Sequence, residues 1–371
     1  MMTIRSPSTL SSSRNFSFLR SSSINRLSSS SRSPVFVKSV FVSTMNITSW
    51  TLPSISKSKS TNESLFPPPS SGYSFFRGVL LSMEQAYLNR NPTAESVLHL
   101  VRSTDDNPVY YDHIAYRTFG IDGHGIDSIS KFFLDFGYTQ RDELSFPKKK
   151  LKALWFSPPD EPVVKGGFGV FGPLPRIFIS ELLVDQMSPQ AQEIIKKYVG
   201  LSGQGHKHAV LSSAIGHLPW PRPSHSEFQQ LASESEYAAW TLVNGYIVNH
   251  VTVSAHKLKC RLKDIQSLNK FIEIQGFSMN SEGGVLKVSP DGLLLQSSTV
   301  ADSMQFEFSD GVKAKVPCSY VEFAERLVLP EYKKLSEHMV EEIHRREGFE
   351  VDNADKIFES TSTNQLNRRV A

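Results

Sequence analysis

The chain has 371 residues, of which 39% are hydrophobic and 21% charged, so it is long enough to bury a sizeable core in one large or two ordinary domains. No window contains the roughly 18 consecutive apolar residues of a membrane-spanning helix, which argues against a transmembrane protein. Cys260 and Cys318 do not form a CxxC pair, so any metal site is expected to use histidine and carboxylate ligands.

The charge is distributed unevenly along the chain. Residues 1–60 carry eight Arg or Lys and no acid, and the remainder has 32 basic against 37 acidic residues. The whole chain therefore has a net charge of +3, but the part after residue 60 has a formal net charge of −5. This balance argues against nucleic-acid binding.

The first 60 residues also contain 21 serines, a composition typical of an organellar transit peptide. The serine excess favours a plastid over a mitochondrion, with an untargeted disordered tail as the alternative. Residues 1–62 are therefore assigned to a transit peptide and disordered linker.

The first predicted elements after this segment are two helices. Their hydrophobic spacing places one from Ser74 to the Asn91-Pro92 break and starts the other at Thr93 as its N-cap. A β-α-β-β-β order follows within residues 112–184. It comprises a strand over 112–119, a helix over 126–136 ended by Gly137, and strands over 138–144, 151–156 and 176–184.

The same order recurs within residues 245–327. The second copy comprises a strand over 245–253, a helix over 264–274 closed by Gly276, short strands over 285–289 and 293–297, and a strand over 319–327. A helical insertion over 186–243 separates the copies, and a helix over 330–346 and a polar tail over 351–371 are predicted to end the chain. The pattern predicts an α+β fold with two βαβββ modules in one domain over residues 74–350.

Histidines and glutamates occupy related places in the two copies. His113 is predicted to open the first strand of copy one, and His250 to close the first strand of copy two. Glu181 and Glu322 each interrupt an otherwise apolar last strand. Burying an unpaired carboxylate costs several kcal/mol, so each glutamate needs a cation or a metal. A single histidine is most often a hydrogen-bonded core or surface residue, but matched positions in a repeat favour a metal site.

The types of ligand side chain indicate which metal the predicted site would bind. Two imidazoles and one carboxylate with open positions are the ligand set of non-haem Fe(II) oxygenases, which favours iron. Arg117 lies four residues after His113, on the same face of the strand and roughly 13 Å away, with the small Ala115 between them. An anionic substrate could bind the metal at one end and the guanidinium at the other. The alternative for Arg117 is a structural salt bridge to Glu181 or Asp112.

Three segments carry a family resemblance: residues 112–119 (DHIAYRTF), 249–252 (NHVT) and 320–326 (YVEFAER). Over about residues 74–350 the chain resembles the vicinal oxygen chelate superfamily and, within it, the 2-oxoadipate dioxygenase/decarboxylase family with its plant plastidial members. The resemblance implies two βαβββ modules that form an open barrel around a metal, with added helices. It also implies His113, His250 and Glu322 as Fe(2+) ligands and Arg117 as the contact of the substrate carboxylate.

The family chemistry that the resemblance implies is conversion of 2-oxoadipate and O2 to 2-hydroxyglutarate and CO2, a step of lysine breakdown. Residues 351–358 match the family's C-terminal segment only loosely, which makes Asp352 and Asn353 additional candidate site residues. Isomerases of the same superfamily use a glutamate from both copies, so Glu181 is a further candidate ligand. Two alternatives stay open: a non-redox metal-dependent isomerase or lyase, and a metal-free plastid structural or binding protein. The oligomeric state is not predicted.

Overall fold

The computed structural model describes residues 72–105, 108–121, 123–161, 167–202, 205–259 and 262–370. The predicted transit peptide and linker over residues 1–62 lie outside these ranges. Within them, no helix combines the length and the apolar character needed to cross a membrane.

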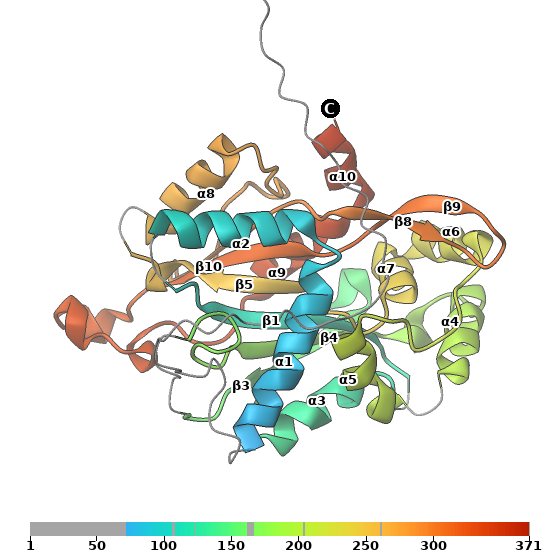
Figure 1. Ribbon diagram of the computed structural model, residues 1–371, viewed down its shortest axis with the longest axis horizontal. Helices are drawn as coiled ribbons and strands as arrows, with labels where there is room; N and C mark the ends of the chain where they lie inside the picture. The colour runs from blue at the N-terminus through green and yellow to red at the C-terminus, as the bar shows by residue number, and fades with distance from the viewer. Residues whose placement is uncertain are drawn as a thin grey trace, which may run out of the picture. The chain divides into compact units, whose positions relative to one another are not determined.

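Eight strands form one open sheet in the order β2-β3-β4-β1-β5-β10-β7-β6 (Figure 1). Each predicted module supplies four of them, and the modules meet where β1 runs antiparallel to β5. The first module consists of β1 (Tyr111–Phe119), α3 (Ile126–Asp135), β2 (Thr139–Phe146), β3 (Leu151–Ser157) and β4 (Arg176–Leu182). The second consists of β5 (His250–Ser254), α8 (Ile265–Ile274), β6 (Lys287–Val288), β7 (Leu294–Ser298) and β10 (Tyr320–Arg326). The repeated β-α-β-β-β order of the sequence is therefore present.

The remaining elements surround this sheet. The other α-helices are α1 (Gly72–Leu88), α2 (Pro92–Asp105), α4 (Pro189–Leu201), α5 (Gly205–Ile215), α6 (His225–Glu234), α7 (Glu236–Asn244), α9 (Val351–Phe358) and α10 (Thr363–Val370). A separate hairpin pairs β8 (Ser303–Glu307) with β9 (Lys313–Pro317). Short 3-10 turns are η1 (Pro147–Lys149), η2 (Val184–Gln186), η3 (Ala255–Lys257) and η8 (Glu359–Thr361).

Local sequence explains the two module helices. Asp264 caps α8, because its side chain accepts a hydrogen bond of 2.8 Å from the backbone N–H of Ser267. Gly137 after α3 and Gly276 after α8 have φ angles of 84° and 89°, a left-handed conformation that glycine adopts without the steric cost of a side chain. The C-terminal ends of α3 and α8 could therefore be predicted from the two glycines.

Two element starts differ from the sequence expectation. The strand predicted from residue 245 begins only at His250, because α7 runs to Asn244 and Gly245, with a φ of 64°, ends that helix. His250 therefore opens its strand and does not close it. Helix α2 begins at Pro92, a favoured first helical residue, and Thr93 bonds the Asp302 side chain through its N–H (2.8 Å) and hydroxyl (2.7 Å).

The helix predicted over residues 330–346 is wrong. The segment holds three separate 3-10 turns, η5 (Pro330–Tyr332), η6 (Glu337–Met339) and η7 (Glu342–His344). Arg326 donates to the backbone carbonyls of Arg346 (3.0 Å) and Gly348 (2.8 Å), and Arg176 pairs with Glu342 at 3.2 Å. These contacts attach the end of the segment to the sheet, and the segment forms separate turns in place of one continuous helix.

The C-terminal segment also differs from the predicted polar tail. Residues 351–370 form α9, η8 and α10, and Ile357 and Phe358 are buried, with 3% and 9% of their surfaces exposed. The apolar residues of α9 recur at helical spacing, so one face of the helix packs against the protein. This face lies over the candidate site described below.

The two faces of the sheet carry different helices. The Tyr116 hydroxyl contacts Met83 of α1 at 3.2 Å, and α1 and α2 lie across the near face of the sheet in Figure 1. Successive side chains of a strand point to opposite faces, so the neighbour Arg117 points the other way and donates to the carbonyl of Phe358 at the end of α9. His113 shares the face of Arg117.

Candidate metal centre

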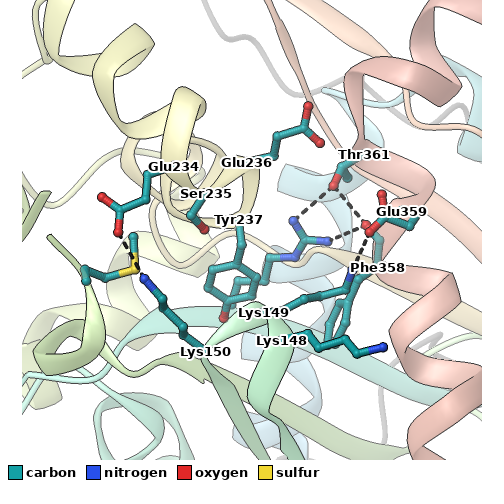
Figure 2. Close-up of a pocket in the computed structure, with 12 residues that line it drawn as sticks. Lys148, Lys149, Lys150, Glu234, Ser235, Glu236, Tyr237, Phe358, Glu359 and Thr361 are labelled. Atoms are coloured by element: carbon teal, nitrogen blue, oxygen red, sulfur yellow. Dashed lines mark hydrogen bonds and ion pairs between the residues drawn. The ribbon is translucent and has the colours of Figure 1, made fainter.

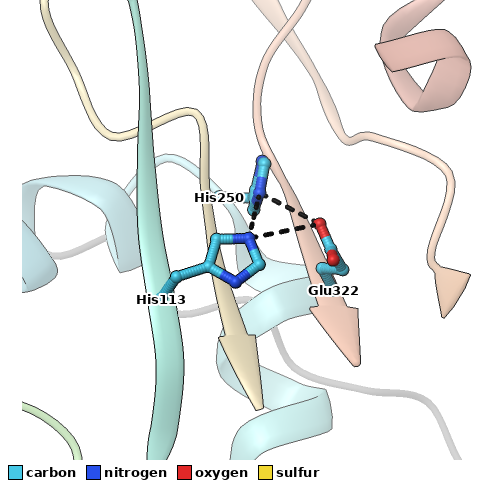
Figure 3. A group of neighbouring side chains, drawn as sticks. All are labelled: His113, His250 and Glu322. Carbon is cyan, nitrogen blue, oxygen red and sulfur yellow. Dashed lines mark hydrogen bonds and ion pairs between the residues drawn. The ribbon is translucent and has the colours of Figure 1, made fainter. Parts of the chain in front are cut away.

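Three neighbouring strands bring together the two histidines and one of the two glutamates that the sequence singled out. His113 lies on β1, His250 on β5 and Glu322 on β10, and these strands are adjacent in the sheet (Figure 3). The register places His113 and Glu322 opposite Thr252, one on each side. His250 precedes Thr252 by two residues and so shares its face. The strand pairing alone therefore makes the three side chains converge.

The donor atoms of this triad lie close together. His250 Nε2 is 3.0 Å and His113 Nε2 is 3.7 Å from Glu322 Oε2, and the two Nε2 atoms are 3.3 Å apart. All three side chains are buried, and the three ligand atoms lie within 4.8 Å of one another, as a metal ion requires. Two imidazoles and one carboxylate suit a metal that keeps open positions. In the described part of the chain, no other group of His, Cys or carboxylate side chains has this arrangement.

Neighbouring side chains set the tautomers of both histidines. Asp112 Oδ1 lies 2.9 Å from Nδ1 of His113, and Asn249 Oδ1 lies 3.0 Å from Nδ1 of His250. Each oxygen accepts the Nδ1 proton, which leaves Nε2 of both rings without a proton and facing the triad, and the Thr252 hydroxyl lies 3.0 Å from Nε2 of His113. Asp112 and Asn249 directly precede the histidines, so the alternation of strand residues did not reveal their role.

The electrostatics of the triad favour a bound cation. Burial would raise the pKa of Glu322, but His113 and His250 hold it at about 2. Burial lowers the pKa of His250 to about 4 despite the attraction of Glu322. For His113, burial acts in the same direction, but Glu322 and Asp112 outweigh it and raise the pKa. At neutral pH Glu322 is therefore ionised and His250 neutral, which are the forms that bind a metal, and the raised pKa of His113 reflects the negative charge that a metal would neutralise.

Asp112 is held in a buried cluster of charges. Arg326 contacts both of its oxygens, with Nε 2.7 Å from Oδ2 and Nη2 2.9 Å from Oδ1, and Arg176 Nη1 lies 3.4 Å from Oδ2. Burial opposes ionisation, but the two guanidinium groups keep the pKa of Asp112 well below its usual value. The sequence offered Arg117 as the partner of Asp112, and the structure shows Arg326 and Arg176 instead. Asp112 thus fixes the His113 ring while its own charge is neutralised.

Arg117 is buried close to the triad, and no carboxylate of the described residues forms an ion pair with it. Its Nη1 donates to the Thr361 hydroxyl (3.0 Å) and its Nη2 to the Phe358 carbonyl (3.3 Å), and its guanidinium lies over the rings of Tyr237 and Trp240. Burial lowers its pKa, but an arginine stays protonated in proteins. Its Nε has no hydrogen-bond partner among the described residues. A buried guanidinium that has an unused donor and no ion pair with a described carboxylate is suited to bind an anion.

Two cavities adjoin these groups. A cavity of about 20 Å³ lies at the triad, and its lining is His113, Phe178, His250, Gln296, Glu322, Phe349, Ala354, Ile357 and Phe358. A cavity of about 210 Å³ is lined by Arg117, Lys148, Lys149, Lys150, Met187, Glu234, Ser235, Glu236, Tyr237, Phe358, Glu359 and Thr361 (Figure 2). Phe358 lines both, so its ring lies between the triad and the larger cavity. The apolar side chains of α9 and Phe349 limit water at the triad.

Glu181, Asp352 and Asn353 are the other candidate site residues from the sequence. Glu181 does not join the triad, because its Oε2 accepts from the N–H of Ile126 (2.8 Å) at the start of α3 and its Oε1 pairs with Lys152 (3.1 Å). The helix N-terminus and the lysine provide the positive charge that this carboxylate needs. Asp352 is exposed on the first turn of α9, whereas Asn353 is buried.

Gln296 is a site residue that the sequence did not suggest. It lies on β7, and its Nε2 donates to Oε1 of Glu322 at 2.7 Å. A single polar residue in a short strand next to a turn is usually solvent-facing, so its spacing carried no signal. Gln296 is nevertheless only 3% exposed, because α9 covers it.

Lys287 on β6 permits a prediction about pH. It is 1% exposed, and its Nζ donates to the carbonyls of Asn280 (2.8 Å) and Val285 (3.2 Å). Burial lowers its pKa to about 8, although Glu322 and Glu282 act in the opposite direction. The ordinary lysine value is about 10.4, so between these two values the unfolded chain binds more protons than the folded one. The free energy of unfolding should therefore rise with pH in this window.

The test compares the metal-free protein with Lys287→Met by urea unfolding at several pH values from about 7 to 10. Other titrating groups are common to both proteins, so the Lys287→Met curve should lack only the contribution of this lysine. We expect the stability of the wild type relative to Lys287→Met to increase above about pH 8. Parallel curves would contradict the prediction.

Known proteins resemble the chain in both sequence and structure. It is 66% identical over 296 residues to the chloroplastic 2-oxoadipate dioxygenase/decarboxylase of Arabidopsis thaliana, with 80% of each chain covered. The crystal structure of the hydroxyglutarate synthase from Oryza sativa in complex with 2-oxoadipate matches with a TM-score of 0.79 and 58% identity, over 84% of this chain and 100% of that chain. A glyoxalase superfamily protein from Ralstonia eutropha JMP134 matches with a TM-score of 0.59 at 19% identity, over 77% and 91% of the two chains.

These similarities settle the fold and the family. The match to the glyoxalase superfamily protein concerns the fold alone, and it confirms the predicted α+β fold of the vicinal oxygen chelate type. The family model described as 2-oxoadipate dioxygenase/decarboxylase matches residues 79–344, which is more than half of the chain. Together with the 66% identity to the Arabidopsis enzyme, this match shows that the chain belongs to the 2-oxoadipate dioxygenase/decarboxylase family.

Proposed function

We propose that the protein is an Fe(2+)-dependent dioxygenase that converts 2-oxoadipate and O2 to 2-hydroxyglutarate and CO2, as a plastid step of lysine catabolism. The observation that carries the proposal is the buried triad, whose two Nε2 atoms and one carboxylate oxygen lie within 4.8 Å of one another. Family membership supports the reaction, and the complex of the Oryza sativa relative with 2-oxoadipate supports the substrate. The chloroplastic Arabidopsis relative and the serine-rich, acid-free residues 1–60 support the location.

Each residue of the site has a role in this proposal. His113, His250 and Glu322 would hold the metal through one atom each. Fe(2+) bound there would supply open positions where a 2-oxo acid and O2 can meet. Arg117 would bind a carboxylate of the substrate through the donors that now contact Thr361 and the Phe358 carbonyl, and so orient the keto acid.

The substrate pocket must also exclude water. Phe178, Phe349 and Phe358 line the cavity at the triad and surround it with apolar surface. A dry pocket strengthens the interaction of Arg117 with an anion and protects reactive species from side reactions. The isomerase or lyase alternative needs Glu181 as a fourth ligand, and Glu181 is engaged at the start of α3.

Oxygen uptake provides the test. The protein, purified anaerobically and loaded with Fe(2+), should consume O2 when 2-oxoadipate is added and release CO2 and 2-hydroxyglutarate in equal amounts. Removal of the metal by a chelator should stop the reaction, and Fe(2+) should restore it. Turnover of 2-oxoadipate without O2 would favour the non-redox alternative. A protein that binds no metal and consumes no O2 would overturn the proposal.

A further inference from the structure

The two oxygens of the Glu322 carboxylate have different partners. Oε2 faces the histidines, at 3.0 Å from Nε2 of His250 and 3.7 Å from Nε2 of His113. Oε1 accepts a hydrogen bond of 2.7 Å from Nε2 of Gln296 on β7. Glu322 and Gln296 are 1% and 3% exposed, so no solvent competes for this bond. One oxygen is thus available to a metal, and the other is already engaged.

A second amide fixes the orientation of Gln296. Nδ2 of Asn353, on α9, donates to Oε1 of Gln296 (3.1 Å) and to the carbonyl of Leu294 (3.3 Å). A backbone carbonyl can only accept, so the Leu294 contact requires the NH2 group of Asn353 on this side. The Gln296 oxygen must then face Asn353, and its NH2 group must face Glu322. The chain of donors runs in one direction from α9 to the carboxylate.

We propose that Gln296 and Asn353 are positioning residues that keep Glu322 a single-atom ligand through Oε2. This inference rests on the proposed function, in which the triad holds the metal. If Oε1 were free, the carboxylate could turn and bind the metal with both oxygens. It would then occupy a position that the 2-oxo acid or O2 requires, because the reaction depends on open positions. The hydrogen bond from Gln296 opposes that rotation.

The arrangement also links the C-terminal segment to the metal centre. Asn353 is 0% exposed and lies on α9, which contributes no ligand. Ala354 and Ile357 of the same helix line the cavity at the triad. The packing of α9 therefore both covers the site and supplies the amide that orients Gln296. Metal affinity should depend on this helix, although Asn353 lies 31 residues after Glu322 in the sequence.

The test uses Co²⁺ added to the metal-free protein, because its visible absorption reports coordination number and its affinity can be measured against a competing chelator. Gln296→Met keeps the length of the side chain but cannot donate, and Asn353→Leu keeps its approximate size. Loss of an outer hydrogen-bond partner of a metal ligand typically weakens metal binding by about 10- to 100-fold, which we expect for Gln296→Met. Its Co²⁺ absorption should also weaken, as it does when coordination number rises.

Two further variants separate positioning from packing. Asn353→Asp is nearly isosteric, and its ionised carboxylate cannot donate to either oxygen, so at a pH where this Asp is ionised it should weaken Co²⁺ binding at least as much as Asn353→Leu. Asn280→Leu is the matched control, because Nδ2 of Asn280 bonds the Lys356 carbonyl (3.0 Å) and the Ser360 hydroxyl (3.0 Å) without touching the triad. It loosens the same C-terminal segment and should leave Co²⁺ affinity near that of the wild type.

The double variant Gln296→Met/Asn353→Leu completes the design. Both residues act on one chain of hydrogen bonds, so the double variant should bind Co²⁺ no more weakly than Gln296→Met alone. Wild-type affinity and absorption in Gln296→Met, or an equal loss in Asn280→Leu, would overturn this inference alone. If Gln296→Met does not fold, the comparison of Asn353→Asp with Asn280→Leu decides. A wild-type protein that binds no Co²⁺ would instead overturn the proposed function, and this inference with it.

Discussion

Replacement of His250 by alanine should abolish metal binding and turnover while the protein remains folded. His250 Nε2 is one of only three donor atoms in the triad, and it lies 3.0 Å from Glu322 Oε2. Loss of an outer hydrogen-bond partner of a ligand weakens metal binding by about 10- to 100-fold. Loss of the ligand itself should weaken metal binding by more than this. The core on both faces of the sheet is apolar and does not contain the metal, so the fold should persist. His113→Ala should behave in the same way.

The measurements are metal content after dialysis, oxygen uptake with 2-oxoadipate, and thermal unfolding followed by circular dichroism. The two glutamates supply a matched pair, since Glu322 and Glu181 occupy the last strands of the two modules. Glu322→Gln should lose the metal. Glu181→Gln should keep it and lose at most about 1 kcal/mol of stability, because Glu181 forms a partly exposed ion pair with Lys152. Full activity in His250→Ala, or the reverse ranking of the glutamates, would show that the site is misplaced.

Arg117→Ala should retain the metal but lower kcat/KM for 2-oxoadipate by roughly 10- to 150-fold. A hydrogen bond to a charged group contributes about 1.5 to 3 kcal/mol, which corresponds to this range. Arg117 is 2% exposed, forms no ion pair with a carboxylate in the part of the chain that the structure describes, and lines the larger cavity next to Phe358. Arg117→Lys should restore activity only in part, because an ammonium keeps the charge but loses the planar pair of donors.

A structural role of Arg117 must be distinguished from a role in substrate binding. Its guanidinium packs on Tyr237 and Trp240, so Arg117→Ala should also lower the thermal stability. Thr361→Val removes a hydrogen-bond partner of Arg117 and leaves the guanidinium in place, which makes it the control. We expect Thr361→Val to keep most of kcat/KM. Near-normal kinetics in Arg117→Ala would limit this arginine to a structural role, and an equal loss of metal would assign it to support of the triad.

Several elements could be predicted because their determinants are local. The helices α3 and α8 have apolar residues at helical spacing, and each is followed by a glycine with positive φ. The strands of both modules are short runs bounded by turns, so their order repeats visibly along the chain. His113, His250 and Glu322 became candidates through this repeat and through the resemblance of the segments that contain them.

Other parts of the molecule depended on contacts between distant segments. The helix expected over residues 330–346 is replaced by three 3-10 turns, and Arg326 and Arg176, which lie on strands of the sheet, attach the end of this segment through their side chains. Glu181 and Glu322 both lie on the last strand of a module, but Glu181 is the sixth residue of β4 and Glu322 the third of β10, and only Glu322 meets the histidines. Phe178 of β4 lines the cavity at the triad, and Glu181, three residues later, points to the opposite face, where it meets the start of α3 and Lys152.

The triad and its surroundings show most clearly which features the sequence determines and which features depend on the tertiary structure. The residue types and their spacing identified two histidines and a carboxylate as donors, because these are properties of individual side chains in a repeated pattern. Their distances required the register of β1, β5 and β10, and their orientation required Asp112, Asn249 and Gln296. The cover by α9 and the link through Asn353 arose only when the C-terminal segment packed on the sheet. The pairing of β1, β5 and β10 joins strands that are far apart in the sequence, and the packing of remote segments depends on the whole folded chain, so neither follows from a local pattern.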